Sequence, residues 1–274
     1  MSKIPRTCYL VALTNLVERS MALGQENIKR YWDCLAKDSF GEGLRFHPLG
    51  GLTNGAYKVE TRSGRYAFKL LNPGTSWQKI DRAAELAIME GAAAIGVAPK
   101  CLLADANKGF VVSEFLEPVA APQNPYDELA PVLRKLQGLS LASLPQLNPV
   151  AACQQYLGKI AAKGVEYPAV EKLVETVDFS SLEKILEPQV LCHGDLVPEN
   201  ILYTGEGIKL IDFEFSGMGH QVWDVAYLRS FCKGDRETQD WLSSFSVEMP
   251  AEEFERLVDL ATLLSLLWSI VGAA

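Results

Sequence analysis

Two short stretches of the sequence carry polar side chains at a spacing that suits one kind of chemistry. The segment His193–Asn200 presents Asp195 and Asn200 five positions apart. Asp212 follows later, directly after the apolar run Ile208–Ile211. An aspartate on such a loop can orient a hydroxyl and accept its proton, while an asparagine and a second aspartate supply oxygen ligands for Mg²⁺. The three side chains predict phosphoryl transfer from a nucleotide to an alcohol, with ATP and Mg²⁺ required.

Lys69 lies upstream in a strand-like segment, Tyr66–Leu71, between a glycine turn and a helical pattern. A strand lysine alone is usually just solvated, but at this place it could reach the α- and β-phosphates of a nucleotide. The helix that follows should supply the carboxylate that fixes it. Glu85 is the expected partner, with Asp81 and Glu90 as open alternatives.

Two backbone segments are expected to meet the nucleotide. The first is a small-residue loop whose N–H groups could approach phosphates, formed by Gly50, Gly51, Thr53, Asn54 and Gly55. Its spacing is not G-x-G-x-x-G, so an ordinary hairpin turn is the alternative. The second follows an apolar strand, where backbone groups near Glu114 and Leu116 are predicted to meet adenine, with a plain linker as the alternative.

The elements that must position these residues are visible as pattern changes. Short alternating segments between glycine turns predict five antiparallel strands, near 44–48, 56–60, 66–71, 101–103 and 110–113. A helix is expected over Trp77–Ala94, ended by Gly96 and Pro99. Before the sheet, residues 7–37 predict two helical stretches broken near Gly24.

After Pro118 the pattern changes to helices punctuated by proline. We therefore predict an α+β, protein-kinase-like bilobal fold, with a small five-stranded antiparallel sheet lobe and a larger, mainly helical lobe. The expected parts are a nucleotide-binding lobe at 1–116 and a catalytic and acceptor-binding lobe at 117–274. Asp224 is predicted either to cap a helix or to anchor the backbone of the catalytic loop, and His193 to pack that loop.

Composition narrows the possible functions. A net charge of −8 argues against nucleic-acid binding, because neutralising phosphates needs a basic surface. Six cysteines without a C-x-x-C pair argue against a zinc site and a disulfide framework and predict a cytoplasmic location. The apolar run Leu257–Ala274 contains Asp259 and is expected to be a buried helix, not a membrane span.

The segments Leu191–Leu202, Leu210–Gly219 and Trp223–Ala226 together resemble the choline/ethanolamine kinase family, within the wider aminoglycoside-phosphotransferase-like superfamily. The most similar branch is the bacterial one, whose choline kinases are associated with lipopolysaccharide decoration. Leu49–Asn54 and Ile80–Glu85 are also similar to family patterns. The resemblance spans about residues 44–270.

This resemblance implies specific roles. Asp195 would be the base, Asn200 and Asp212 would bind Mg²⁺, and Lys69 would contact ATP. Glu214, in place of the glycine of D-F-G, would add a metal contact. Choline kinases hold a quaternary ammonium among aromatic rings, and the candidates are Phe215, Trp223, Tyr227 and Trp268. Ordinary core packing is the alternative for each ring.

The expected acceptor is therefore a small, cationic alcohol such as choline or ethanolamine. Thiamine, aminoglycoside and sugar kinases share the same machinery and are alternatives. A catalytically inactive pseudokinase that binds nucleotide or acts as a scaffold is an alternative from another class, and the presence of Lys69, Asp195, Asn200 and Asp212 argues against it.

Overall fold

A computed structural model describes residues 25–50, 55–71, 80–123, 125–162, 164, 167–187, 189–232 and 238–273. Several predictions from the sequence lie outside these residues. They concern the first of the two N-terminal helical stretches, the loop residues Gly51, Thr53 and Asn54, and the expected first turn of the helix after the sheet.

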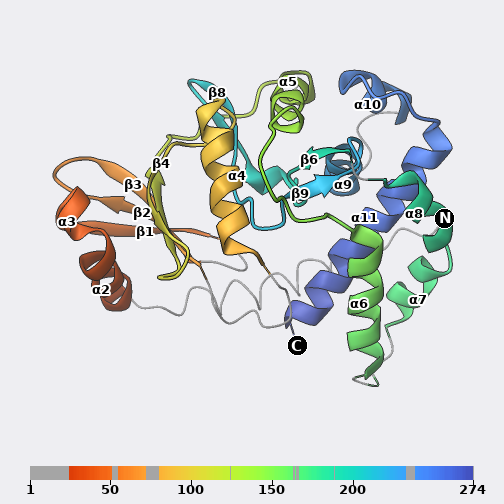
Figure 1. The fold of residues 1–274 in the computed structure, drawn as a ribbon, viewed down its shortest axis with the longest axis horizontal. Helices are drawn as coiled ribbons and strands as arrows, with labels where there is room; N and C mark the ends of the chain where they lie inside the picture. Colours follow the sequence, from red (N-terminus) through yellow and green to blue (C-terminus); the bar gives the residue numbers. More distant parts are fainter. Residues whose placement is uncertain are drawn as a thin grey trace.

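The N-terminal part contains the predicted five-stranded antiparallel sheet, which is therefore confirmed. Its strand order is β1 (Arg45–Gly50), β2 (Gly55–Glu60), β3 (Arg65–Leu70), β5 (Phe110–Glu114) and β4 (Cys101–Asp105). Helix α2 (Gln25–Leu35) and the short α3 (Lys37–Phe40) lie against the sheet (Figure 1). Trp32 of α2 is fully buried, packs edge-on against Phe68 at 5.4 Å, and donates a hydrogen bond to the carbonyl of Gly41.

Helix α4 (Arg82–Ala94) stands between the sheet and the helical lobe (Figure 1). It begins at Arg82, because Asp81 has an extended backbone and its side chain accepts a hydrogen bond from the backbone N–H of Ala84. Asp81 is thus the N-cap of the helix, a position that favours aspartate. Ile88 and Ala92 on α4 are buried in the core of the helical lobe, so α4 packs on both parts of the molecule.

The helical lobe is built around α11 (Ala251–Ala273), which packs against α6 (Pro149–Ala162), α7 (Pro168–Val174) and α9 (Trp223–Phe231) (Figure 1). Its leucines form a fully buried stripe at Leu257, Leu260, Leu263 and Leu267. The remaining helices are α5 (Pro125–Gln137), α8 (Phe179–Ile185) and α10 (Thr238–Ser244). Among the described residues, no helix is long and apolar enough to cross a membrane.

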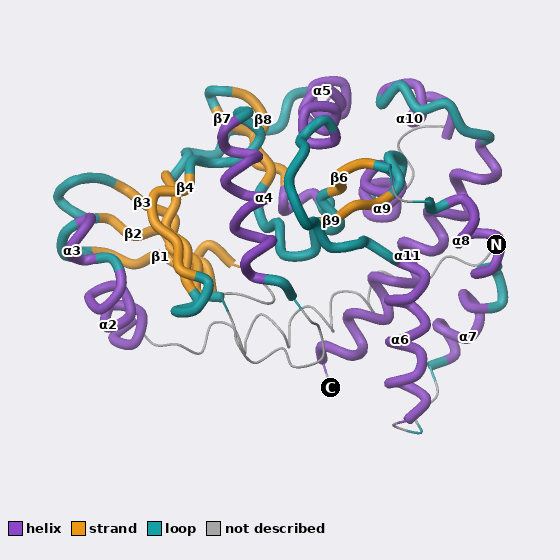
Figure 2. Tube along the Cα trace, in the orientation of Figure 1, coloured by secondary structure: helices purple, strands orange, loops and turns teal. Residues whose placement is uncertain are grey.

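Two small two-stranded sheets lie inside the helical lobe and frame the predicted catalytic segment (Figure 2). Strand β6 (Val190–Cys192) pairs with β9 (Gly217–Gly219), and β7 (Ile201–Thr204) pairs with β8 (Gly207–Leu210). The catalytic segment connects β6 to β7, while the segment that carries Asp212 and Glu214 connects β8 to β9. The two chemistry-bearing loops therefore leave adjacent strands and lie side by side.

Candidate active site

The backbone of the catalytic loop is held by Asp224, at the start of α9. One carboxylate oxygen accepts a hydrogen bond from the N–H of His193 at 2.7 Å, and the other accepts from the N–H of Gly194 at 2.9 Å. The side chain of Asp224 is fully buried. Of the two roles left open by the sequence, the structure therefore gives Asp224 the anchoring one, which fixes the loop immediately before Asp195.

Gly194 lets the two chemistry-bearing loops approach each other closely. Its φ of +82° lies in the left-handed region, and a Cβ atom there would lie 2.2 Å from the carbonyl oxygen of Phe215. No side chain fits such a space, so glycine is required. Ser216 adds a hydrogen bond from its hydroxyl to the carbonyl of His193 at 2.8 Å.

His193 has the packing role predicted from the sequence. Its ring is fully buried, and Nε2 lies 2.9 Å from the carbonyl oxygen of Ile211, which makes Nε2 the donor. Burial lowers the pKa of His193, so the ring is neutral. The imidazole thus ties the catalytic loop to the residue just before Asp212.

Asp195 and Asn200 face each other across the catalytic loop. The amide Nδ2 of Asn200 donates to the backbone carbonyl of Asp195 at 2.9 Å and to its carboxylate at 3.1 Å. This leaves the amide oxygen of Asn200 available for a cation. Burial, together with the carboxylates of Asp212 and Glu214, raises the pKa of Asp195 to about 7, although hydrogen bonds from Tyr227 and Asn200 oppose the shift.

Lys69 reaches from β3 to both lobes. Its Nζ lies 2.9 Å from Oε1 of Glu85 on α4 and 2.7 Å from Oδ1 of Asp212. Glu85 is therefore the partner among the three carboxylates that the sequence left open, since Asp81 caps α4 and Glu90 is exposed. Burial disfavours the charge on Lys69, but the carboxylates of Asp212 and Glu85 outweigh it and raise the pKa of Lys69.

Arg82 is a member of the site that sequence reasoning missed. Its guanidinium lies 2.6 Å from Oε2 of Glu85 and 3.1 Å from Oε2 of Glu214, whose side chain is only 2% exposed. The signal available in the sequence was the spacing of Arg82 and Glu85, because residues three apart on a helix share one face. Glu214, 132 residues away from Arg82, could not be paired with it by local spacing.

The residues predicted to hold a metal form a set of oxygen donors, as Mg²⁺ requires. They are the carboxylates of Asp212 and Glu214 and the amide oxygen of Asn200. Within the described part of the chain, no group of three or more His, Cys, Asp or Glu side chains is placed to hold a metal ion. The donor chemistry fits Mg²⁺, while each of the two carboxylates is paired with a cation, Lys69 or Arg82.

The predicted adenine-binding segment follows β5. The N–H of Glu114 donates to the carbonyl of Lys100 at 3.0 Å, and its side chain accepts from the N–H of Lys100 at 2.7 Å, so Glu114 extends the pairing of β5 with β4 by one residue. Leu116 is partly buried and makes no backbone hydrogen bond to another described residue. Of the predicted phosphate loop, Gly50 ends β1 and Gly55 begins β2, next to the strand that carries Lys69.

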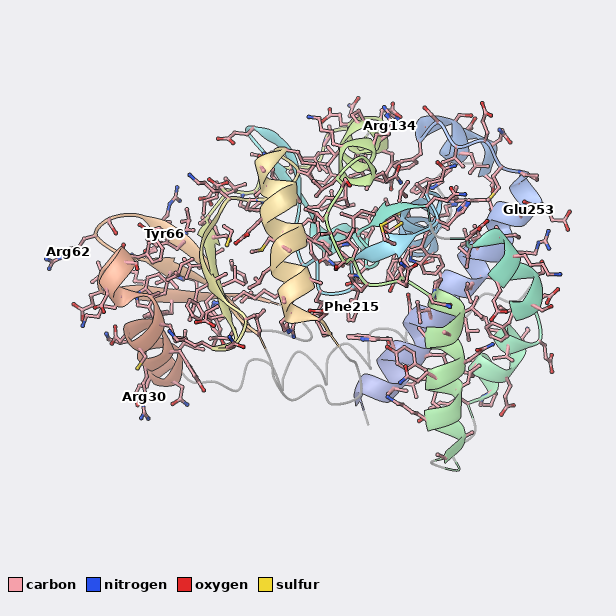
Figure 3. The ribbon with its side chains drawn as sticks, in the orientation of Figure 1. Arg30, Arg62, Tyr66, Arg134, Phe215 and Glu253 are labelled. Carbon is pink, nitrogen blue, oxygen red and sulfur yellow. The ribbon has the colours of Figure 1, made fainter. Side chains whose placement is uncertain are left out.

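The four predicted acceptor-binding rings have different environments. Trp223 is fully buried in the helical core, with its ring 5.7 Å from that of Tyr227. The hydroxyl of Tyr227 hydrogen-bonds to Asp195, which places this ring directly beside the predicted base. Phe215 is partly exposed near the N-terminal end of α4 (Figure 3), and Trp268 is partly buried on α11. Trp223 and Tyr227 are both buried in the helical core, whereas Phe215 and Trp268 are only partly buried.

Known proteins resemble this chain in both sequence and fold. LicA of Haemophilus influenzae is 25% identical over 209 residues, which are 73% of this chain and 61% of LicA, so the match spans less than two thirds of that relative. The crystal structure of the choline kinase LicA from Streptococcus pneumoniae is 26% identical, with a TM-score of 0.71 over 90% of this chain and 89% of that one.

A choline/ethanolamine kinase family protein from Mesorhizobium loti is 25% identical, with a TM-score of 0.68 over 89% of this chain and 83% of that one. These likenesses confirm the predicted fold. The sequence model of one family matches residues 45–250, three quarters of the chain and all the site residues described above except Trp268. The chain therefore belongs to the phosphotransferase enzyme family.

Proposed function

We propose that this protein transfers the γ-phosphoryl group of ATP, with Mg²⁺, to the hydroxyl of a small cationic alcohol, choline or ethanolamine being the leading candidates. One observation carries the proposal. Asp195 lies on a loop whose backbone is bound by Asp224, and next to it the pairing of Lys69 with Asp212 joins the sheet lobe to the neighbouring β8–β9 connection. The residues proposed as base, metal ligand and phosphate-binding lysine come from three separate parts of the chain.

The geometry supports a role for each of these residues. Asp195 would accept the proton of the acceptor hydroxyl, and its pKa of about 7 is close to the value that favours a general base at neutral pH. The amide of Asn200 holds the Asp195 carboxylate in place. Lys69, positioned by Glu85, would bind the nucleotide phosphates. Mg²⁺, held by Asn200, Asp212 and Glu214, would neutralise charge on the phosphates.

The choice of acceptor is supported by the relatives and by the rings beside the base. The relatives include a structure named as choline kinase LicA and a second LicA structure in complex with AMP. Tyr227 and Phe215 lie next to Asp195 and the Asp212–Glu214 loop, where their faces could stabilise a quaternary ammonium by cation–π attraction. The surrounding carboxylates would favour a cation over a neutral sugar.

Turnover of Mg-ATP with a panel of acceptors tests the proposal. Choline, ethanolamine, thiamine, an aminoglycoside and a neutral sugar would be compared, with Asp195→Asn as the inactive control and Asp240→Asn, an exposed carboxylate on α10, as the matched control. We expect choline or ethanolamine to stimulate turnover in the wild type and in Asp240→Asn only. Preference for thiamine would overturn the acceptor assignment, and binding of Mg-ATP with no acceptor-dependent turnover would favour a scaffold.

A further inference from the structure

The side chain of Asp195 has a hydrogen-bond partner outside its own loop. Besides the bond from the amide of Asn200, its carboxylate accepts a hydrogen bond from the hydroxyl of Tyr227. Tyr227 lies three residues after Asp224 on α9, so the two side chains leave the same face of that helix. This face therefore binds the predicted catalytic loop twice, its backbone through Asp224 and its acidic side chain through Tyr227.

The ring of Tyr227 is held in place by packing. It is 7% exposed, and its centroid lies 5.7 Å from that of Trp223 and 5.5 Å from that of Phe231, one helical turn before and after it. A phenylalanine would fill such a position equally well, and burying a hydroxyl is costly unless it has a partner. The hydroxyl of Tyr227 is thus best explained by the bond that it makes.

That bond restricts the orientation of the carboxylate. A general base must hold one oxygen within hydrogen-bond distance of the proton that it accepts. With the amide of Asn200 alone, which comes from the same loop, the carboxylate of Asp195 could still turn about its Cβ–Cγ bond. A second donor on a separate, buried helix removes much of this freedom, and charge-assisted hydrogen bonds of this kind are the strong ones.

We propose that Tyr227 is a positioning residue for the base, whose hydroxyl holds the carboxylate of Asp195 in the orientation needed to accept the proton of the acceptor. The inference rests on the proposed function, in which Asp195 is that base. It gives the hydroxyl of Tyr227 a role that is separate from any contact between its ring and the acceptor.

Kinetics of Tyr227→Phe test the proposal, because the variant keeps the ring and loses only the hydroxyl. We expect kcat to fall about tenfold, the effect of one hydrogen bond to a charged group. The KM values for ATP and for choline or ethanolamine should stay within about twofold of the wild type, since the bond matters for the transfer step and not for binding. An unchanged kcat, or a raised KM for the acceptor with an unchanged kcat, would overturn the proposal.

Tyr66→Phe is the matched control. It also removes a tyrosine hydroxyl with a side-chain partner, since the hydroxyl of Tyr66 lies 3.2 Å from that of Ser63, but it does so in the sheet lobe. Its kcat should stay within about twofold of the wild type. A fall in kcat as large as that of Tyr227→Phe would mean that loss of a hydroxyl acts through general stability, and would overturn the proposal.

Thermal unfolding without nucleotide or acceptor tests the contact itself. Tyr227→Phe should lower the Tm by about 3 °C when Asp195 is present and should have no such effect in Asp195→Ala, where the hydroxyl has already lost its partner. An equal loss of Tm in both backgrounds would show that the hydroxyl does not act through Asp195.

The two experiments separate this inference from the proposed function. A protein that shows the coupling between Tyr227 and Asp195 but no acceptor-dependent turnover would retain the contact and lose the proposed function. A protein that turns over choline equally well with Tyr227→Phe would retain the function and lose the inference.

Discussion

The two halves of the site are held together by different means. The predicted catalytic loop is fixed inside one lobe by buried side chains: Asp224 accepts from its backbone N–H groups and Ser216 donates to its backbone carbonyl. In addition, the ring of His193 bonds to the carbonyl of Ile211 on the neighbouring segment. The phosphate side is instead a chain of ion pairs between lobes, in which Lys69 and Arg82 each bridge two carboxylates. In the loop, each backbone group has its own side-chain hydrogen-bond partner. In the ion-pair network, each cation is divided between two carboxylates.

This difference separates a part of the site with fixed contacts from a part whose ion pairs can be exchanged for contacts to a ligand. The carboxylate of Asp224 is fully buried and so out of reach of a ligand, and we therefore expect the loop that carries Asp195 to keep its geometry when substrate binds. The ion pairs lie among the residues predicted to bind metal and phosphates, and each cation contacts two carboxylates, so we expect one contact to remain when a ligand replaces the other. The candidate site thus combines a fixed loop, which carries the predicted base, with a network of ion pairs on the side predicted to bind phosphates.

The largest expected effect is on turnover and comes from the fixed half. Asp195→Asn removes the base while keeping the shape of the side chain, and kcat should fall by about 10²–10⁴. The Tm in EDTA should not fall, because the amide removes repulsion from Asp212 and Glu214. Acceptor-dependent turnover above about a tenth of the wild-type rate would show that Asp195 is not the base.

The same variant has a pH signature. The pKa of Asp195 rises from 3.8 to about 7 on folding, so over this range the folded protein binds more protons than the unfolded one. Wild-type stability should therefore decline relative to Asp195→Asn as the pH rises from 4 to 7. Urea unfolding in EDTA at several pH values measures this difference, and a constant difference would contradict the raised pKa.

The next largest effect is on stability and comes from Asp224, which binds the backbone of the catalytic loop. Asp224→Asn can accept only one of the two backbone hydrogen bonds and turns an NH₂ group toward the other donor, which should cost about 2–3 kcal/mol in the free energy of unfolding. Urea unfolding measures it, with Asp240→Asn as the exposed control. If Asp224→Asn is as stable as the control, other contacts hold the loop backbone. The contrast between a loop fixed by hydrogen bonds and a side held by ion pairs would then be wrong.

A smaller cost is expected on the exchangeable half. Glu85→Gln leaves Lys69 paired with Asp212 and Arg82 paired with Glu214, so we expect a loss of about 1–2 kcal/mol together with a higher KM for ATP. The higher KM would show that Lys69 binds ATP less well once Glu85 no longer holds its ammonium group in place. A destabilisation larger than that of Asp224→Asn would mean that the remaining pairs, Lys69 with Asp212 and Arg82 with Glu214, do not compensate for the loss of Glu85.

The smallest effect is that of salt. Because Lys69 and Asp212 keep 20% and 26% of their side chains exposed, NaCl should weaken the inter-lobe pairs slightly. Between 0.1 and 0.5 M NaCl, the stability difference between the wild type and Glu85→Gln should shrink by less than about 0.5 kcal/mol. The difference for Asp224→Asn should not change, since that carboxylate is fully buried.

Part of this molecule could be predicted from the sequence because the information is local. Alternating residues and glycine turns predict the five strands, and the spacing of Asp195, Asn200 and Asp212 predicts their chemistry. A loop of fixed length constrains which side chains it can present together. The position of Asp224 at the start of a predicted helix likewise leaves only two roles for it, capping that helix or binding the backbone of the catalytic loop.

Only the tertiary structure decided the pairings across long stretches of chain. Local spacing left Lys69 with three candidate carboxylates, and it gave no sign that Arg82 meets Glu214 or that Trp223 lies fully in the core while Tyr227 reaches Asp195. Such contacts depend on how α4 and the β8–β9 connection pack between the lobes. The sequence thus determines which chemical groups are available, and the packing of distant elements determines which charges neutralise one another.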